Sequence, residues 1–167
     1  MALLINIACY LVALVGMEAV AWATHKWIMH GPLWSLHRSH HTPRHGAFEL
    51  NDLFAVFFAL PAILMFWVGT DRGWDTLTWA AAGVTSYGVL YAVVHDGLVH
   101  QRWPFRIVPK RGYLKSLVQA HRLHHAVNEK EGAVSFGFLA PQDVRKLAQS
   151  LKSRRVEVET EAEASDV

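Results

Sequence analysis

The sequence predicts an all-α fold: a polytopic membrane helical bundle of about three to four transmembrane helices, with a histidine-rich helical cap. Two observations predict it. The 167 residues are 52% hydrophobic and have a positive mean hydropathy, which is unusual for a soluble domain of this length. The chain also has 11 histidines, and ten of them fall into four short clusters beside the apolar segments. Together these observations indicate a membrane protein with a metal site.

The first apolar segment covers residues 2–23 and is interrupted only by Asn6 and Glu18. It is long enough for the roughly 20 helical residues that cross a hydrocarbon core. Its start lacks a positively charged region, so we expect an uncleaved span instead of a signal peptide. Glu18 is a functional candidate because a carboxylate inside a span is costly; a neutral, hydrogen-bonded carboxyl is the alternative.

The next two apolar segments cover residues 53–69 and 77–94 and are separated by the short polar sequence TDRGWD. This pattern predicts a helical hairpin. Pro61 lies inside the first of the two segments, where it removes one backbone hydrogen bond and would kink the helix. A neighbouring membrane helix can tolerate such a kink.

Positive charge predicts the orientation of the spans. The hairpin turn carries only Arg72, whereas the stretches after the first and third spans carry Lys26, Arg38, Arg44, Arg102, Arg106, Lys110 and Arg111. By the positive-inside rule the amino terminus is outside, and the histidine-rich cap faces the cytoplasm.

Beyond the third span the pattern changes. Residues 112–128 are expected to be helical, and whether they form a fourth membrane helix stays open. Residues 140–155 suggest a short surface helix, and the acidic end VEVETEAEASDV is expected to be disordered. We therefore divide the chain into a membrane-embedded domain, residues 1–140, and an appended helix and tail, residues 141–167.

Composition excludes several classes of function. The single cysteine, Cys9, lies in an apolar span, so neither a disulfide framework nor a thiolate metal cluster is expected. The net charge of +2 is small and the basic residues form no continuous stripe, so nucleic acid is not an expected partner.

The histidine clusters repeat one pattern, HxxxxH followed by HxxHH, after the first span and again after the third. The clusters are HKWIMH with His25 and His30, HRSHH with His37, His40 and His41, HDGLVH with His95 and His100, and HRLHH with His121, His124 and His125. Histidines at i, i+3 and i+4 share a helix face, so each triplet can converge on a metal. The HxxxxH pairs would lie about 140° apart on a regular helix. A helix end, a π-bulge, or two histidines serving different metals would each resolve this.

The type and number of the expected ligands limit which metal ions the site could hold. Imidazole suits zinc, copper, iron and nickel. Ten histidines exceed the need of one ion and fit two, and redox chemistry is the usual reason to pair metals in a membrane, so two iron ions are the leading interpretation. A zinc pair for hydrolysis stays open. A histidine-rich membrane metal transporter is a different class, although its ligands should lie near mid-bilayer, whereas these lie beyond the ends of spans.

Carboxylates near the clusters are candidates to orient the histidines. Asp96 adjoins His95 and could accept an imidazole N–H, or could cap a helix end. Glu49 and Asp52 precede the second span and could act in the same way, or could only favour the helix N-terminus. His45 stays outside the expected ligand set.

The sequence segments around the histidine clusters resemble those of a known protein family. HRSHHTPRHGAFELNDLF (37–54), HDGLVHQRWPF (95–105) and HRLHHAVNEKEGAVSFGFL (121–139) resemble the bacterial β-carotene hydroxylases of the fatty acid hydroxylase superfamily. The resemblance covers roughly residues 15–140 and includes all ten clustered histidines; the last residues are unmatched.

The resemblance implies O2-dependent hydroxylation at carbon 3 of β-ionone rings, converting β-carotene through β-cryptoxanthin to zeaxanthin, and extends to 4-keto carotenoids, giving astaxanthin. It implies that the ten histidines ligate two non-haem irons, with no catalytic residue beyond the metal centre. A separate ferredoxin or reductase would supply electrons, the carotenoid would enter from the bilayer, and the location would be the bacterial inner membrane. The alternatives are related hydroxylases, desaturases or ketolases acting on acyl, sterol or carotenoid substrates. The oligomeric state is not predicted.

Overall fold

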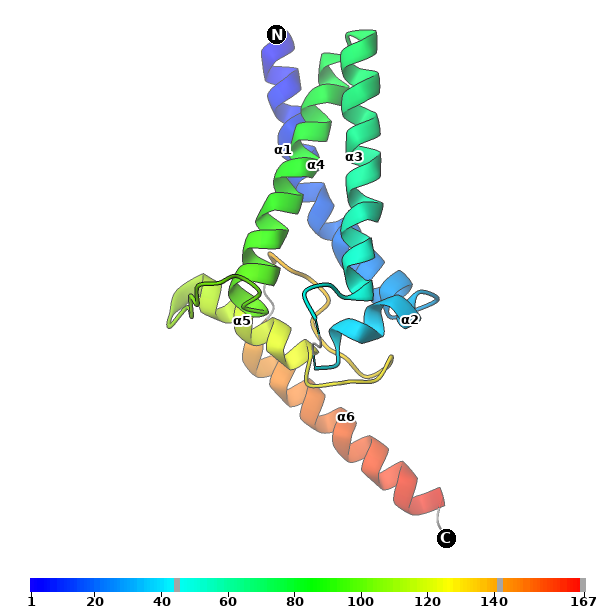
Figure 1. The fold of residues 1–167 in the computed structure, drawn as a ribbon. Coiled ribbons are helices and arrows are strands. Elements are labelled where there is room, and N and C mark those ends of the chain that lie inside the picture. Colours follow the sequence, from blue (N-terminus) through cyan, green and yellow to red (C-terminus); the bar gives the residue numbers. More distant parts are fainter. Residues whose placement is uncertain (44–45, 141–142, 166–167) are drawn as a thin grey trace.

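The computed structural model describes residues 1–43, 46–140 and 143–165, and every regular element in them is helical. Three long helices form the upright part of the molecule: α1 (Ala2–Ala23), α3 (Leu53–Arg72) and α4 (Asp75–Tyr91). The N-terminus and the α3–α4 turn lie at one end of this part, and the remaining helices lie at the other end (Figure 1). The predicted all-α class and the predicted hairpin are confirmed.

Within the described residues, three segments are long and apolar enough to cross a membrane: Ala2–Met29, Leu50–Arg72 and Asp75–Val99. Large apolar side chains on their surfaces remain uncovered, such as Val12 at 72% and Trp67 at 66% exposure, which suits a surface that faces lipid. α5 (Gly112–His124) has only 13 residues, fewer than the roughly 20 that a crossing needs. The structure therefore supports three membrane helices.

α4 lies between the other two spans and packs closely against both. A Cβ on Gly83 would lie 2.4 Å from the backbone oxygen of Tyr10 in α1, and a Cβ on Gly69 in α3 would lie 2.5 Å from Oγ1 of Thr78 in α4. Glycine therefore allows the backbones to approach, as small residues commonly do between membrane helices. These contacts hold the three helices together at a distance from the histidines.

The cap is built from several short helices and one long helix, α6 (Val144–Ser165). After α1 comes a π-helix, η1 (Thr24–Met29), and after α4 comes a second π-helix, η4 (Ala92–Val99). Between the first two spans lie α2 (Trp34–His37) and the 3₁₀ helices η2 (Arg38–His40) and η3 (Leu50–Asp52). α5 packs against α6 through a buried apolar cluster of Ala120, Val134, Leu147 and Leu151.

α6 is longer than the short surface helix expected over residues 140–155, and it continues, as far as Ser165, into the acidic sequence for which we expected disorder. Asp143 accepts hydrogen bonds from the backbone N–H groups of Arg145 and Lys146 and so begins this helix. The division of the chain at residue 140 remains a prediction. His45 and Arg44 lie outside the described residues.

Candidate metal centre

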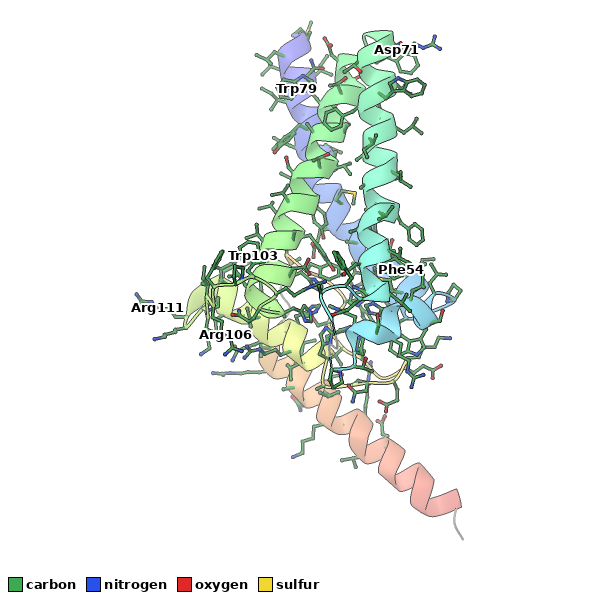
Figure 2. The ribbon with its side chains drawn as sticks, viewed as in Figure 1. Phe54, Asp71, Trp79, Trp103, Arg106 and Arg111 are labelled. Carbon is green, nitrogen blue, oxygen red and sulfur yellow. The ribbon has the colours of Figure 1, made fainter. Side chains whose placement is uncertain are left out.

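The predicted ligands gather in two groups, the first buried and the second mostly buried, where the spans meet the cap. The first group is His25, His30, His37, His41 and His124, and the second is His40, His95, His100 and His121; in each, one ring nitrogen per residue lies within 4.8 Å of the others. The tenth predicted ligand, His125, places Nε2 2.9 Å from Nε2 of His121, beside the second group. In Figure 2, nitrogen-bearing side chains crowd the region near Phe54, at the end of α3.

Both HxxxxH pairs lie on π-helical turns. The backbone N–H of His30 donates to the carbonyl of His25 at 3.0 Å, and that of His100 donates to His95 at 2.9 Å. An i to i+5 hydrogen bond closes a wider turn than an α-helix, so it brings residues five apart onto the same side. Of the three solutions left open by the sequence, the structure adopts the π-helix, and each pair serves one group.

The HxxHH triplets do not converge as units, which corrects the expectation that each triplet meets one metal. His37 and His41 join the first group, whereas His40 joins the second. In the other triplet His121 belongs to the second group with His125 beside it, whereas His124 joins the first. The middle histidine of each triplet therefore crosses to the other group, so neither group can form without both halves of the chain.

Hydrogen bonds fix the tautomers of the first group. Each of its five rings donates from Nδ1 to an oxygen that can only accept; the acceptors are the carbonyls of Phe136, Lys130, Val127 and Val134 and the Oδ1 of Asn51, at 2.7 to 3.0 Å. A neutral imidazole with its proton on Nδ1 has a bare lone pair on Nε2. All five Nε2 atoms therefore point lone pairs into one small space.

Burial keeps these imidazole rings neutral, because it lowers their pKa values. Desolvation is the largest cause that lowers the pKa of His37 to about 3 and that of His41 to about 4. Nε2 of His37 nevertheless lies 3.1 Å from Nε2 of His25 and 3.2 Å from Nε2 of His41. With no proton between them, such lone pairs repel each other unless a cation lies among them. The donor set of the first group thus fits a metal ion.

The second group has charged hydrogen-bond partners. His40 Nδ1 donates to Oε2 of Glu49 at 3.0 Å, and His95 Nδ1 donates to Oδ1 of Asp96 at 2.8 Å. A carboxylate behind a metal-ligating histidine fixes its tautomer and orientation. Burial also lowers the pKa of His40, His100 and His121 and that of His125 to about 2. These rings are neutral as well and can offer lone pairs to a metal.

Glu49 and Asp96 accept hydrogen bonds from histidines, whereas Asp52 forms an ion pair with Arg102. Both of its oxygens accept hydrogen bonds from the Arg102 guanidinium, at 2.6 and 2.7 Å, and one of them also accepts the backbone N–H of Glu49. The sequence analysis did not single out Arg102 or Asn51 as site residues, although Arg102 lies in the segment HDGLVHQRWPF and Asn51 lies in HRSHHTPRHGAFELNDLF. It also missed the carbonyls of residues 127–136, because a backbone acceptor has no residue signature.

Glu18 anchors the segment that supplies those carbonyls. Its carboxylate accepts the backbone N–H groups of Phe138, Leu139 and Ala140 at 2.9 to 3.1 Å and the hydroxyl of Tyr87 at 2.7 Å. These donors compensate a carboxylate inside the first span, which would otherwise be costly. Glu18 therefore holds residues 138–140 against the membrane helices.

Glu18→Leu is expected to destabilise the protein by about 3 kcal/mol or more, because several buried donors lose their acceptor at about 1–3 kcal/mol each. Glu18→Gln keeps an acceptor oxygen and should cost less. Unfolding of the detergent-purified variants, followed by circular dichroism, measures the difference. Equal stability of the leucine variant and the parent would contradict the anchoring role.

An apolar cavity of about 540 Å³ lies beside the histidines, with walls from α1, α3 and α4. Its lining includes Met17, Phe54, Phe58, Ala62, Gly88 and Val89. Tyr91 and Phe138 also line it and stack on histidines of the site, Tyr91 on His95 at 4.5 Å and Phe138 on His25 at 5.1 Å between ring centroids. An apolar molecule from the bilayer could thus reach the edge of the metal centre.

Acid is expected to destabilise the metal-free fold. A histidine of the unfolded chain has a pKa of about 6.5, whereas His37 and His41 have lowered pKa values of about 3 and about 4. From about pH 6.5 down to about pH 4 the unfolded chain therefore binds protons that the folded chain does not. Stability is fully present above this window and falls within it by up to about 1.4 kcal/mol per pH unit for each histidine. Thermal unfolding of metal-stripped protein measures this; a constant Tm from neutral pH into this window would contradict it.

Comparison with known proteins adds an independent finding. Residues 10–142 match the model of a family described as fatty acid hydroxylase. The chain is 55% identical over 149 residues to the beta-carotene hydroxylase of Pantoea ananas, covering 89% of this chain and 85% of that protein. It is 54% identical over 152 residues to the beta-carotene hydroxylase of Pseudescherichia vulneris, covering 91% and 86%. The beta-carotene 3-hydroxylase 2 of Arabidopsis thaliana, a chloroplastic protein, is 42% identical over 81% of this chain and 45% of its own length. No solved structure matches the chain significantly.

Proposed function

The chain belongs to the fatty acid hydroxylase family, and from this premise we propose that it is a membrane-bound beta-carotene hydroxylase. It inserts one oxygen atom of O2 into the C–H bond at carbon 3 of a β-ionone ring, giving β-cryptoxanthin and then zeaxanthin. The observation that carries the proposal is the position of the two histidine groups, directly beside an apolar cavity between membrane helices. The names of relatives that match most of the chain support the same substrate.

Two non-haem iron ions would occupy the two histidine groups. His25, His30, His37, His41 and His124 would hold one ion, and His40, His95, His100, His121 and His125 would hold the other. The support is chemical: neutral imidazoles with their lone pairs directed at a common point suit iron, and their number suits two ions. When bound, the irons would supply the activation of O2 that an unactivated C–H bond requires.

The protein itself positions the substrate and keeps water out. The apolar cavity walls favour a hydrocarbon ring that arrives laterally from the bilayer. Phe138 and Tyr91 line the cavity and also stack on histidines of the site. They would therefore contact the β-ionone ring of the substrate beside the metal centre. The Nδ1 protons stay on the outer side of the imidazoles, bound to carbonyls or to carboxylates, which leaves the inner side free of donors that could compete with the metal.

Electrons must come from another protein. Hydroxylation puts one oxygen atom of O2 on the substrate and releases the other as water, which requires two electrons and two protons from outside. A separate ferredoxin or reductase would deliver them to the cap. The basic residues near the cap, including Arg106 and Arg111 on the loop after the third span (Figure 2), support a cytoplasm-facing cap in a bacterial inner membrane.

Pigment analysis tests the proposal. The intact chain and a His37→Ala control are expressed aerobically in a bacterial host that accumulates β-carotene. We expect β-cryptoxanthin and zeaxanthin from the intact chain only. Unchanged β-carotene, despite membrane insertion, bound iron and a supplied electron donor, would redirect the assignment to keto-carotenoid, acyl or sterol substrates.

A further inference from the structure

The two histidine groups differ in the charge of the partners behind them. In the first group every Nδ1 donates to an uncharged acceptor, either a backbone carbonyl or the Asn51 amide. In the second group His40 and His95 donate to the carboxylates of Glu49 and Asp96. A carboxylate partner makes an imidazole a more basic ligand than a carbonyl partner does. The groups are therefore chemically unequal although they mirror each other in sequence.

The Arg102 guanidinium contacts two carboxylates, those of Asp52 and Asp96. The Arg102 guanidinium donates two hydrogen bonds to the Asp52 carboxylate, at 2.6 and 2.7 Å. Its Nη1 also lies 3.8 Å from Oδ1 of Asp96. Asp52 and Glu49 in turn bind each other's backbone in a capping box at the start of η3. The side chain of Arg102 is 14% exposed and those of Asp52 and Asp96 are 26% and 30% exposed, so this network is partly shielded from water.

Arg102 is held more firmly than a residue of an ordinary surface ion pair. Arg102 also donates its backbone N–H to the carbonyl of Asp96 at 2.8 Å, so it is fixed to Asp96 by main chain and to Asp52 by side chain. Through Asp52 it fixes Glu49, which holds His40; through Asp96 it fixes His95. A planar fork with two parallel hydrogen bonds gives this position a precision that a lysine cannot reproduce.

We propose that Arg102 is a positioning residue that holds Glu49 and Asp96 behind the second histidine group, and that this group consequently binds its metal more tightly than the first. The inference rests on the proposed metal centre and deepens it. Two carboxylates close to the second ion add Coulomb attraction as well as ligand basicity, and the uncharged partners of the first group add neither. The protein would therefore load and release its two ions in a fixed order.

Anaerobic release of iron tests this in the full-length protein, purified in detergent, loaded with Fe²⁺ and challenged with a chelator. The parent should lose its ions in two phases whose rates differ about 10-fold or more. The isosteric variants Glu49→Gln and Asp96→Asn should accelerate the slow phase about 10- to 100-fold and leave the fast phase unchanged. Arg102→Gln should accelerate the slow phase too, with partial rescue in Arg102→Lys. Arg106→Gln, an exposed arginine on the same loop (Figure 2), is the matched control and should change neither phase.

Asn51→Asp supplies the converse test, since it places a carboxylate behind His37 of the first group without changing shape. It should slow the fast phase and bring the two rates together, which a merely structural role of the network would not cause. Release of both ions at one rate from the parent, or equal effects of Asp96→Asn on both phases, would overturn the inference. Should Arg102→Gln lose helical structure by circular dichroism, the isosteric variants decide alone. A parent that binds no metal would instead refute the proposed function.

Discussion

His124→Ala is expected to abolish carotenoid hydroxylation and to lower the bound iron. The ring of His124 is fully buried, and its Nε2 lies 3.2 Å from Nε2 of both His30 and His41. It is the residue through which α5 completes a group built otherwise from the first half of the chain. Loss of a direct ligand should exceed the roughly 10- to 100-fold effect of losing a partner behind a ligand, so product should fall below about 1% of the parent.

Chromatography of pigments and iron per purified chain measure both effects of His124→Ala. His45→Ala is the control, since His45 lies outside the predicted ligand set and should be dispensable. A His124→Ala protein with full iron and full product would remove this residue from the metal centre. Loss of product in both variants alike would indicate that the ligand set was assigned incorrectly.

Gly88→Trp is expected to reduce hydroxylation about 100-fold while leaving the iron in place. Gly88 lines the apolar cavity, and a Cβ at this position would meet no atom within 4 Å. A side chain can therefore start from this position without a clash at Cβ, and a large ring that extends into the cavity would exclude or displace the substrate ring. Misplacing a reacting carbon by about 1 Å can cost 10²-fold in rate.

Gly16→Trp provides the matched control for Gly88→Trp. Gly16 also lies in a span, on α1, and a Cβ there would likewise meet no atom within 4 Å, but Gly16 does not belong to the cavity wall. The Gly16 variant should keep both iron and activity. Unchanged zeaxanthin formation by the Gly88 variant would show that the substrate uses another route to the histidines.

The spans and the candidate metal ligands were accessible from sequence because each leaves a local signal. Residues 53–69 and 77–94 are apolar over about the length that a bilayer requires, and the structure has helices there. The histidine clusters signal a metal site because so many ionisable side chains beside a membrane need a common purpose. Composition and spacing were enough for these features.

The division of the histidines into two groups was not accessible from sequence, because it depends on how distant segments pack together. His40 and His41 are neighbours in sequence, yet they serve different groups since α5 inserts His124 on one side and His121 on the other. The carbonyl of Phe136 and the guanidinium of Arg102 also contribute, but neither a backbone carbonyl nor an arginine marks a metal site by its residue type. The π-helical turns were one of three open solutions, and only the hydrogen bonds of His30 and His100 distinguish them.

Oxygen labelling tests the central claim most directly. The purified, iron-loaded chain is given β-carotene in detergent or lipid, an electron-donor system and ¹⁸O2, and the products are weighed by mass spectrometry. We predict that every new hydroxyl of β-cryptoxanthin and zeaxanthin carries ¹⁸O from the gas. Hydroxyl oxygen that comes from water, or oxygen uptake without any labelled carotenoid while another lipid becomes labelled, would contradict an oxygenase that acts on carotenoid rings.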